Sequence, residues 1–217
     1  MKTLLLYLRY DDVPQHWARP RRPGVCLLDA FGICSCLLAM FLLVRCPALV
    51  VLPLSLLAMY LASFRYHMWE EDAGRRKLDL LMIFVPIAGT QIAFSGHFVP
   101  APDIYLRVVV TIALTTSCMV VKALRHAKLS DVANVSLYFC VASPVVYSAF
   151  EMQVWLTPLQ ACGFWAGCVF YATNGIVNTI MKPDPFPRVF GWRCVQHAAI
   201  YGGCTTHLLV AISVSIQ

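Results

Sequence analysis

The sequence predicts an all-α membrane protein, a bundle of seven transmembrane helices with the N-terminus in the cytosol and the C-terminus outside. Three observations support this fold class. Of the 217 residues, 59% are hydrophobic and only 13% are charged, and the mean hydropathy is +0.69, well above that of soluble domains. The apolar residues form separate runs of roughly 20 residues, the length that crosses a bilayer as a helix. The basic residues gather in alternate breaks between these runs.

Seven runs are apolar and long enough to be transmembrane helices. In chain order they cover residues 25–44, 48–67, 78–95, 104–124, 132–150, 156–176 and 194–215. The break between the first two is the least distinct, because it consists only of Arg45, Cys46 and Pro47. Residues 1–23 are expected to form a cytosolic N-terminal tail, and residues 24–217 a single transmembrane domain.

Two pairs of residues shape individual helices. Pro86 and Pro144 lie inside the third and fifth runs, where proline removes a backbone hydrogen bond, so each predicts a kink. Gly163 and Gly167 are four residues apart in the sixth run and predict close packing against a neighbouring helix of the same bundle.

The distribution of basic residues sets the orientation. If the N-terminus is cytosolic, all of the 17 Lys and Arg residues except Arg45 and Arg107 fall on the cytosolic side. This topology is opposite to that of G-protein-coupled receptors. The net charge of +6 follows from this bias, so no nucleic-acid partner is expected. The ten cysteines lie mostly within apolar runs and are interpreted as reduced, buried hydrophobic residues.

Several titratable residues lie at one depth, near the predicted cytosolic face. The second run ends at His67, the third begins near Asp79, and the seventh begins with Arg193, Cys194 and His197. Ionisable groups in a membrane segment are costly unless they are paired, solvated or bound to a metal. We therefore expect these residues to converge in one functional site.

Helical spacing supports this convergence. Ser63 lies four residues before His67, on the same helix face, and Cys194 lies three residues before His197. His207 lies ten residues beyond His197, about 15 Å along the helix, and is interpreted as a packed polar residue outside the cluster. Asp29 lies inside the first run and needs a partner that the sequence does not identify.

Each of these residues also has a simpler interpretation. His67 can reach the headgroups as an interfacial histidine. Asp79 can begin a helix, where a carboxylate interacts favourably with the helix dipole. Arg193 can be one more basic residue on the cytosolic side.

Three short motifs resemble the haemolysin III and progestin and adipoQ receptor (adiponectin receptor) superfamily. They are Ser63-x-x-x-His67, Leu78-Asp79 followed by Ile87-Ala88-Gly89-Thr90, and residues 187–197 (PRVFGWRCVQH) with His207 ten residues later. The resemblance implies seven helices and a zinc ion held by three histidines near the cytosolic face. His67 and His197 match two of these ligands, and Asp79 matches the acidic residue that holds a metal-bound water.

The third ligand position departs from the family pattern. Arg193 stands where the first histidine of the seventh-helix pair belongs, and a guanidinium has no lone pair to give a metal. If zinc is retained, Cys194 is the nearest replacement ligand, and Asp79 binds directly or through water.

Two functions follow from these alternatives. With zinc, the resemblance implies hydrolysis of an amide in a membrane lipid, such as a ceramide, with Asp79 and Ser63 as candidate catalytic residues. Without zinc, Arg193 pairs with Asp79 and the chain is a non-catalytic receptor-like or regulatory membrane protein. A pore is a third alternative, but no repeat of charged pore-lining residues supports it. Membrane lipids are the expected partners, with one of them as substrate under the zinc alternative. The sequence identifies neither the host membrane nor the oligomeric state.

Overall fold

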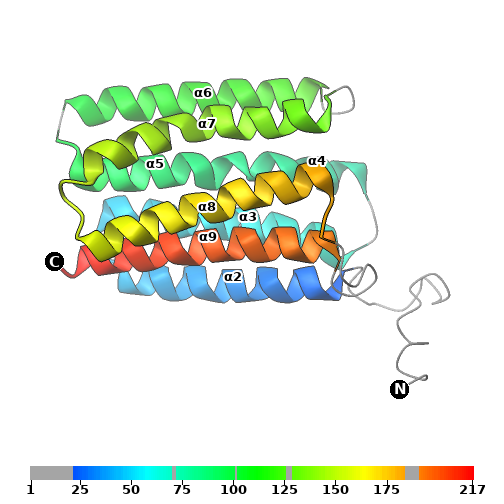
Figure 1. Cartoon of the computed structure of the whole chain (residues 1–217), viewed down its shortest axis with the longest axis horizontal. Coiled ribbons are helices and arrows are strands. Elements are labelled where there is room, and N and C mark those ends of the chain that lie inside the picture. The colour runs from blue at the N-terminus through cyan, green and yellow to red at the C-terminus, as the bar shows by residue number, and fades with distance from the viewer. Residues whose placement is uncertain (1–21, 70–71, 101, 126–128, 184–190) are drawn as a thin grey trace, which may run out of the picture.

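A computed structural model describes residues 22–69, 72–100, 102–125, 129–183 and 191–217. Within these ranges all regular structure is helical (Figure 1). The helices are α2 (Pro23–Leu42), α3 (Pro47–Met68), α4 (Ala73–Met82), α5 (Phe84–Phe98), α6 (Asp103–Arg125), α7 (Asp131–Met152), α8 (Pro158–Ile180) and α9 (Trp192–Ser215). The predicted all-α class is confirmed, whereas nearly all of the predicted tail lies outside the described residues.

Six stretches of the described chain are long and apolar enough to cross a membrane. They correspond to the first five predicted spans and the seventh, with α4 and α5 together forming the third. The sixth predicted span corresponds to α8, which has 23 residues but is not among the six. Gln160, Asn174 and Asn178 lower its hydropathy. The count of seven spans and the orientation of the termini therefore stay predictions.

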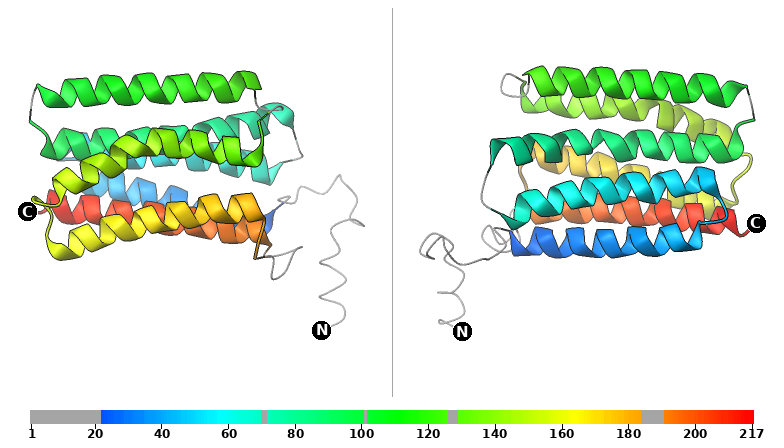
Figure 2. Two further views of the ribbon diagram at one scale, coloured as in Figure 1. Left: turned by 45° about the horizontal axis from the view of Figure 1, so that its top comes forward. Right: turned by 180° about the vertical axis from the view of Figure 1, so that it is seen from behind.

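The helices lie side by side with their axes nearly parallel (Figure 2). On one side of the bundle α2 packs against α3 and α9, and α8 packs along α9. On the other side α6 and α7 pack against each other and against α5, which also contacts α3. The first residues of α2 and α9 lie at the same end of the bundle, and the chain ends at the opposite end (Figure 1).

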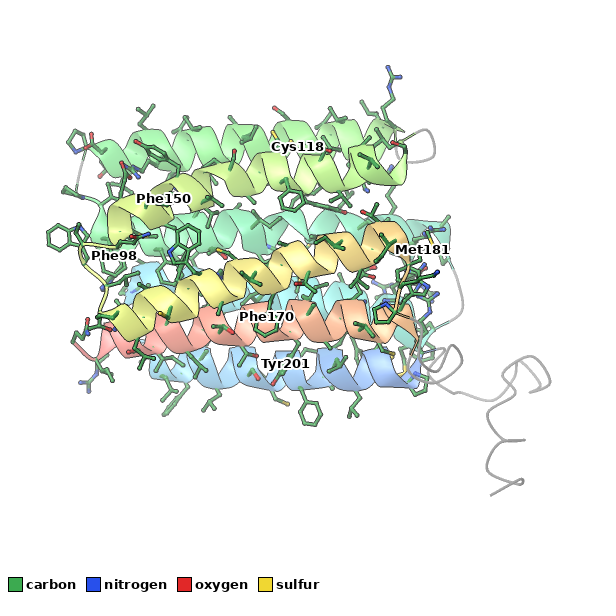
Figure 3. All side chains as sticks on the ribbon, in the orientation of Figure 1. Phe98, Cys118, Phe150, Phe170, Met181 and Tyr201 are labelled. Carbon is green, nitrogen blue, oxygen red and sulfur yellow. The ribbon has the colours of Figure 1, made fainter. Side chains whose placement is uncertain are left out.

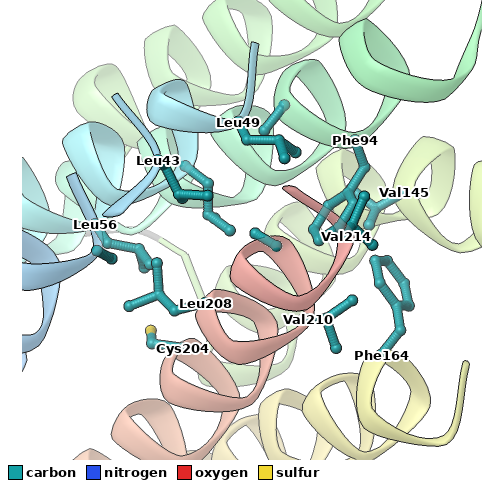
Figure 4. Packing of buried hydrophobic residues seen from close by; sticks show 14 of the residues in the cluster. Leu43, Leu49, Leu56, Phe94, Val145, Phe164, Cys204, Leu208, Val210 and Val214 are labelled. Carbon is teal, nitrogen blue, oxygen red and sulfur yellow. The ribbon is translucent and has the colours of Figure 1, made fainter. Parts of the chain in front are cut away.

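The interior is closely packed, and the outer surface is apolar. Phe94 of α5 and Phe164 of α8 meet edge to face with ring centroids 5.1 Å apart, next to Val210 and Val214 of α9 (Figure 4). Large hydrophobic side chains such as Phe150 and Phe170 are exposed on the outside (Figure 3). An apolar exterior suits contact with lipid rather than water.

The break between α4 and α5 has a clear sequence cause. Pro86 has no N–H to donate to the carbonyl of Met82, four residues earlier, and α4 ends at Met82. Helical structure resumes at Phe84 after the single residue Ile83. This interruption agrees with the predicted kink at Pro86, whereas α7 continues through Pro144.

The predicted glycine pair packs against α9. A Cβ atom on Gly163 would lie 2.9 Å from Cγ2 of Val210, and one on Gly167 would lie 2.3 Å from Cδ2 of His207. Both glycines therefore let α9 approach α8 closely, as expected from their spacing.

Candidate functional site

A cluster of polar side chains lies at the end of the bundle where α3 ends and α9 begins. We call Asp29, Ser63, His67, Asp79 and His197 the histidine cluster. Asp29, Ser63 and His67 are buried, with 1%, 4% and 1% of their surfaces exposed. The cluster is assembled from three consecutive helices, α2, α3 and α4, and from α9, which is distant in sequence.

Asp29 connects two helices of the cluster. Its Oδ2 accepts a hydrogen bond of 2.8 Å from the Ser63 hydroxyl, and its Oδ1 lies 3.3 Å from Nδ1 of His197. An ionised carboxylate only accepts hydrogen bonds, so Nδ1 of His197 is the donor. In the neutral ring this leaves Nε2 of His197 with a lone pair for a proton or a metal.

His67 is held differently. Its ring lies 5.0 Å from that of His197, centroid to centroid, at an angle of 84°. Nη1 of Arg22 lies 3.4 Å from Nδ1 of His67, and a guanidinium can only donate. The neutral His67 ring then carries its proton on Nε2, so its metal-binding lone pair is engaged by Arg22.

Asp79 is the remaining residue of the histidine cluster, and Arg193 lies near it. Asp79 lies close to the Ser63 hydroxyl, which donates its hydrogen bond to Asp29, and within electrostatic range of His197, Asp29 and Arg193. It is partly exposed, and it lies four residues before the helix break at Ile83. The guanidinium carbon of Arg193 lies 4.4 Å from the ring centroid of Trp192, which favours a cation–π contact.

A cavity of about 270 Å³ adjoins the cluster. It lies between α5 and α7 on one side and α8 and α9 on the other, with α3, α4 and α6 contributing single residues or short stretches. Asp79 of the histidine cluster and the neighbouring Arg193 line it; the other four residues of the cluster do not. Two further cations line it, the exposed Arg76 and the buried Lys122, whose ammonium contacts Asn134 and the Tyr138 ring. Most of the remaining lining is apolar.

The residues present fit a zinc ion only in part. Two imidazoles are close together, and Asp29 orients one of them as carboxylates do around bound metals. However, no three His, Cys, Asp or Glu side chains within the described ranges are grouped so that they could hold one metal ion. Cys194 is buried at the start of α9, within electrostatic range of Arg22. The zinc ion and the roles of its ligands therefore stay predictions.

The structure brings together His67, Asp79 and His197, which the sequence placed at one depth, and Ser63, which it placed on the same helix face as His67. The sequence left the partner of Asp29 unidentified, and the structure provides two, Ser63 and His197. It also adds Arg22, which sequence reasoning placed in the tail. The one signal in the sequence that α2 contributes to the histidine cluster was the carboxylate of Asp29 inside the first apolar run.

These features define a class, an integral multi-pass membrane protein with a polar cluster beside a largely apolar cavity inside its bundle. The chain belongs to the haemolysin-III related family, whose model matches residues 24–208. This match confirms the resemblance drawn from the sequence motifs. Comparisons with curated proteins and with solved structures gave no match.

Proposed function

We propose that this protein binds a membrane lipid, with the polar headgroup of the lipid at Asp79 and Arg193 and its hydrocarbon chain in the cavity. The observation that carries the proposal is that a carboxylate and a guanidinium both line a cavity whose other walls are mostly apolar. Pockets of this kind, apolar with a few placed polar groups, are typical ligand sites.

The chemistry of the two side chains suits a lipid amide such as a ceramide. The Asp79 carboxylate can accept hydrogen bonds from hydroxyl or amide donors, and the Arg193 guanidinium can donate to a carbonyl oxygen. The Asp79 carboxylate lies beside two side chains of the histidine cluster, Ser63 and His197. Asp29 holds both of them in place.

Lipid binding to purified protein tests this proposal. Radiolabelled ceramide is titrated against wild type and Arg193→Met in detergent micelles, with Arg107→Met as the control because Arg107 does not line the cavity. A charge-assisted hydrogen bond contributes about 1.5–3 kcal/mol, so Arg193→Met is expected to weaken binding at least about tenfold. Equal affinities for wild type and Arg193→Met would reject the headgroup site.

A second titration identifies the headgroup more closely. Arg76 and Lys122 also line the cavity, so ceramide phosphate is titrated beside ceramide. Tighter binding of ceramide phosphate would assign an anionic headgroup to the site, whereas tighter binding of ceramide would assign a neutral one.

Zinc-dependent hydrolysis of a lipid amide is the second candidate function. It is favoured by the two imidazole rings 5.0 Å apart and by the hydrogen bond between Asp29 and His197. To bind zinc, His67 would have to give up the hydrogen bond from Arg22. The ion would also need a third protein ligand. A bound zinc ion lowers the pKa of its water and polarises a carbonyl group.

Restoring a histidine at position 193 tests this second candidate. Arg193→His should raise the zinc content of purified protein towards one ion per chain if the centre lacks only that ligand. Arg193→His combined with His197→Ala should lose the gain. If wild type already holds stoichiometric zinc and releases fatty acid from ceramide, hydrolysis replaces simple binding as the function.

A further inference from the structure

A second polar position lies in the cavity, far from the histidine cluster. His207 lines the cavity and is 1% exposed. It lies 14 residues after Arg193 on α9, which corresponds to about 21 Å along the helix. The cavity therefore has polar groups near both of its ends.

The His207 ring is fixed in one orientation. It stacks on Phe164 with ring centroids 4.6 Å apart, and the Tyr171 ring meets it edge to face at 5.4 Å. Nε2 lies 3.0 Å from the backbone carbonyl oxygen of Phe164, which can only accept, so Nε2 carries the proton. The absence of a side chain at Gly167 makes room for the Cδ2–Nε2 edge.

This arrangement leaves the other ring nitrogen as an acceptor. With the proton on Nε2, the lone pair of Nδ1 is available. Nδ1 is not among the ring atoms nearest to Gly167, which are Cδ2, Nε2 and Cγ. Among the residues that the structure describes, Nδ1 has no hydrogen-bond partner although it is fully buried. An unpaired buried polar atom costs free energy, so a partner supplied by a ligand would be favourable.

Packing alone does not explain these features. A leucine or phenylalanine at position 207 would fill apolar space without an unpaired nitrogen. Instead, the structure combines a polar ring, its one hydrogen bond and a glycine that admits it, all on the wall of the cavity.

We infer that Nδ1 of His207 accepts a hydrogen bond from a hydroxyl group on the distal part of the bound lipid. The protein then selects amphiphiles that carry a hydroxyl far from the headgroup over equivalent lipids with a plain hydrocarbon chain. This inference rests on the proposed lipid binding and adds to it a second point of recognition.

The test compares two ceramides that differ only at the end of the acyl chain, one ω-hydroxylated and one plain. Both are titrated against the full chain in detergent micelles. A hydrogen bond of ordinary net strength predicts about fivefold tighter binding of the hydroxylated ceramide to wild type. His207→Phe keeps an aromatic ring but has no acceptor, so it should bind both ceramides with the affinity that wild type has for the plain one.

Two further variants separate this inference from effects on folding. His207→Gln retains a hydrogen-bond acceptor and should keep part of the preference. Thr111→Val removes a buried hydroxyl that has no hydrogen-bond partner within the described ranges and does not line the cavity, so it should leave the full preference intact.

The outcomes distinguish this inference from the proposed function. Equal binding of both ceramides to wild type, or an unchanged preference in His207→Phe, overturns the role of His207 and leaves lipid binding standing. Failure of wild type to bind either ceramide overturns both.

Discussion

Two polar clusters lie near opposite ends of the bundle, and they differ in what surrounds them. One is the histidine cluster. The other, which we call the arginine cluster, links α5, α6 and α7 and consists of Gln91, Ser95, Arg107, Ser148 and Glu151. Arg107 donates to Ser148 at 3.2 Å and to the Glu151 carboxylate, and Gln91 donates to Ser95 and Ser148 at 3.0 and 2.7 Å.

Both clusters place ionisable or strongly polar groups in an apolar bundle, and both are extensively hydrogen-bonded. Only the histidine cluster contributes a residue to the cavity, namely Asp79, with Arg193 beside it. Within the described residues, the arginine cluster does not line the cavity. Polarity inside a membrane bundle therefore marks a ligand site only where the polar groups reach an internal space; elsewhere the same groups join helices.

The largest expected loss of stability comes from removing Asp29, the residue at the centre of the histidine cluster. Asp29→Ala leaves the Ser63 hydroxyl and Nδ1 of His197 without their shared acceptor in a buried site. Because hydrogen bonds to charged groups contribute about 1.5–3 kcal/mol each, we expect the free energy of unfolding to fall by about 3 kcal/mol. Unfolding in mixed detergent micelles measures this change.

Asp29→Asn is the matched variant, because its side-chain oxygen can still accept the hydrogen bond from Ser63. Its loss of stability should be clearly smaller than that of Asp29→Ala. A stability of Asp29→Ala equal to wild type would contradict the central position given to Asp29.

The second largest loss of stability is expected at the wall of the cavity, where Gly167 lies against His207. Gly167→Ala would place a methyl group 2.3 Å from the His207 ring, which Phe164 and Tyr171 hold in place. Overpacking of this kind costs about 1–3 kcal/mol, and the contact of 2.3 Å with a held ring favours the upper end of that range. Alanine favours a helix over glycine by about 1 kcal/mol, so we expect a net loss of about 2 kcal/mol in the same unfolding assay.

Gly163→Ala is the control for Gly167→Ala. Its methyl group meets a single atom of Val210 at 2.9 Å, and alanine favours a helix over glycine by about 1 kcal/mol. The two contributions should nearly cancel. A larger loss for Gly163→Ala than for Gly167→Ala would show that His207 is free to move.

The smallest effect is expected in the arginine cluster. The side chains of Arg107 and Glu151 are 24% and 39% exposed. Exposed ion pairs contribute about 0–1 kcal/mol, so Glu151→Ala should lower the free energy of unfolding by no more than about 1 kcal/mol. Ceramide affinity should not change. A loss of affinity in this variant would show that the two clusters are coupled.

The sequence predicted the helices and the meeting of His67, Asp79 and His197 because both follow from position along the chain. Hydropathy sets where an apolar helix begins and ends, and the residue number within a helix sets depth in the membrane. The sequence did not predict the partners of Asp29, because they depend on α2 lying beside α3 and α9 with Asp29 facing inward. That arrangement is decided by packing of side chains from distant helices. The cavity and the acceptor of His207 escaped prediction for the same reason.

The most direct test of lipid binding is a substitution that fills the cavity with a large side chain. Ala142 lines it on α7, whereas Ala113 is exposed on α6 and does not line it. We predict that Ala142→Trp abolishes binding of radiolabelled ceramide to the purified protein, while Ala113→Trp binds it as wild type does. Undiminished binding by a folded Ala142→Trp protein would contradict the proposal that this cavity holds the lipid.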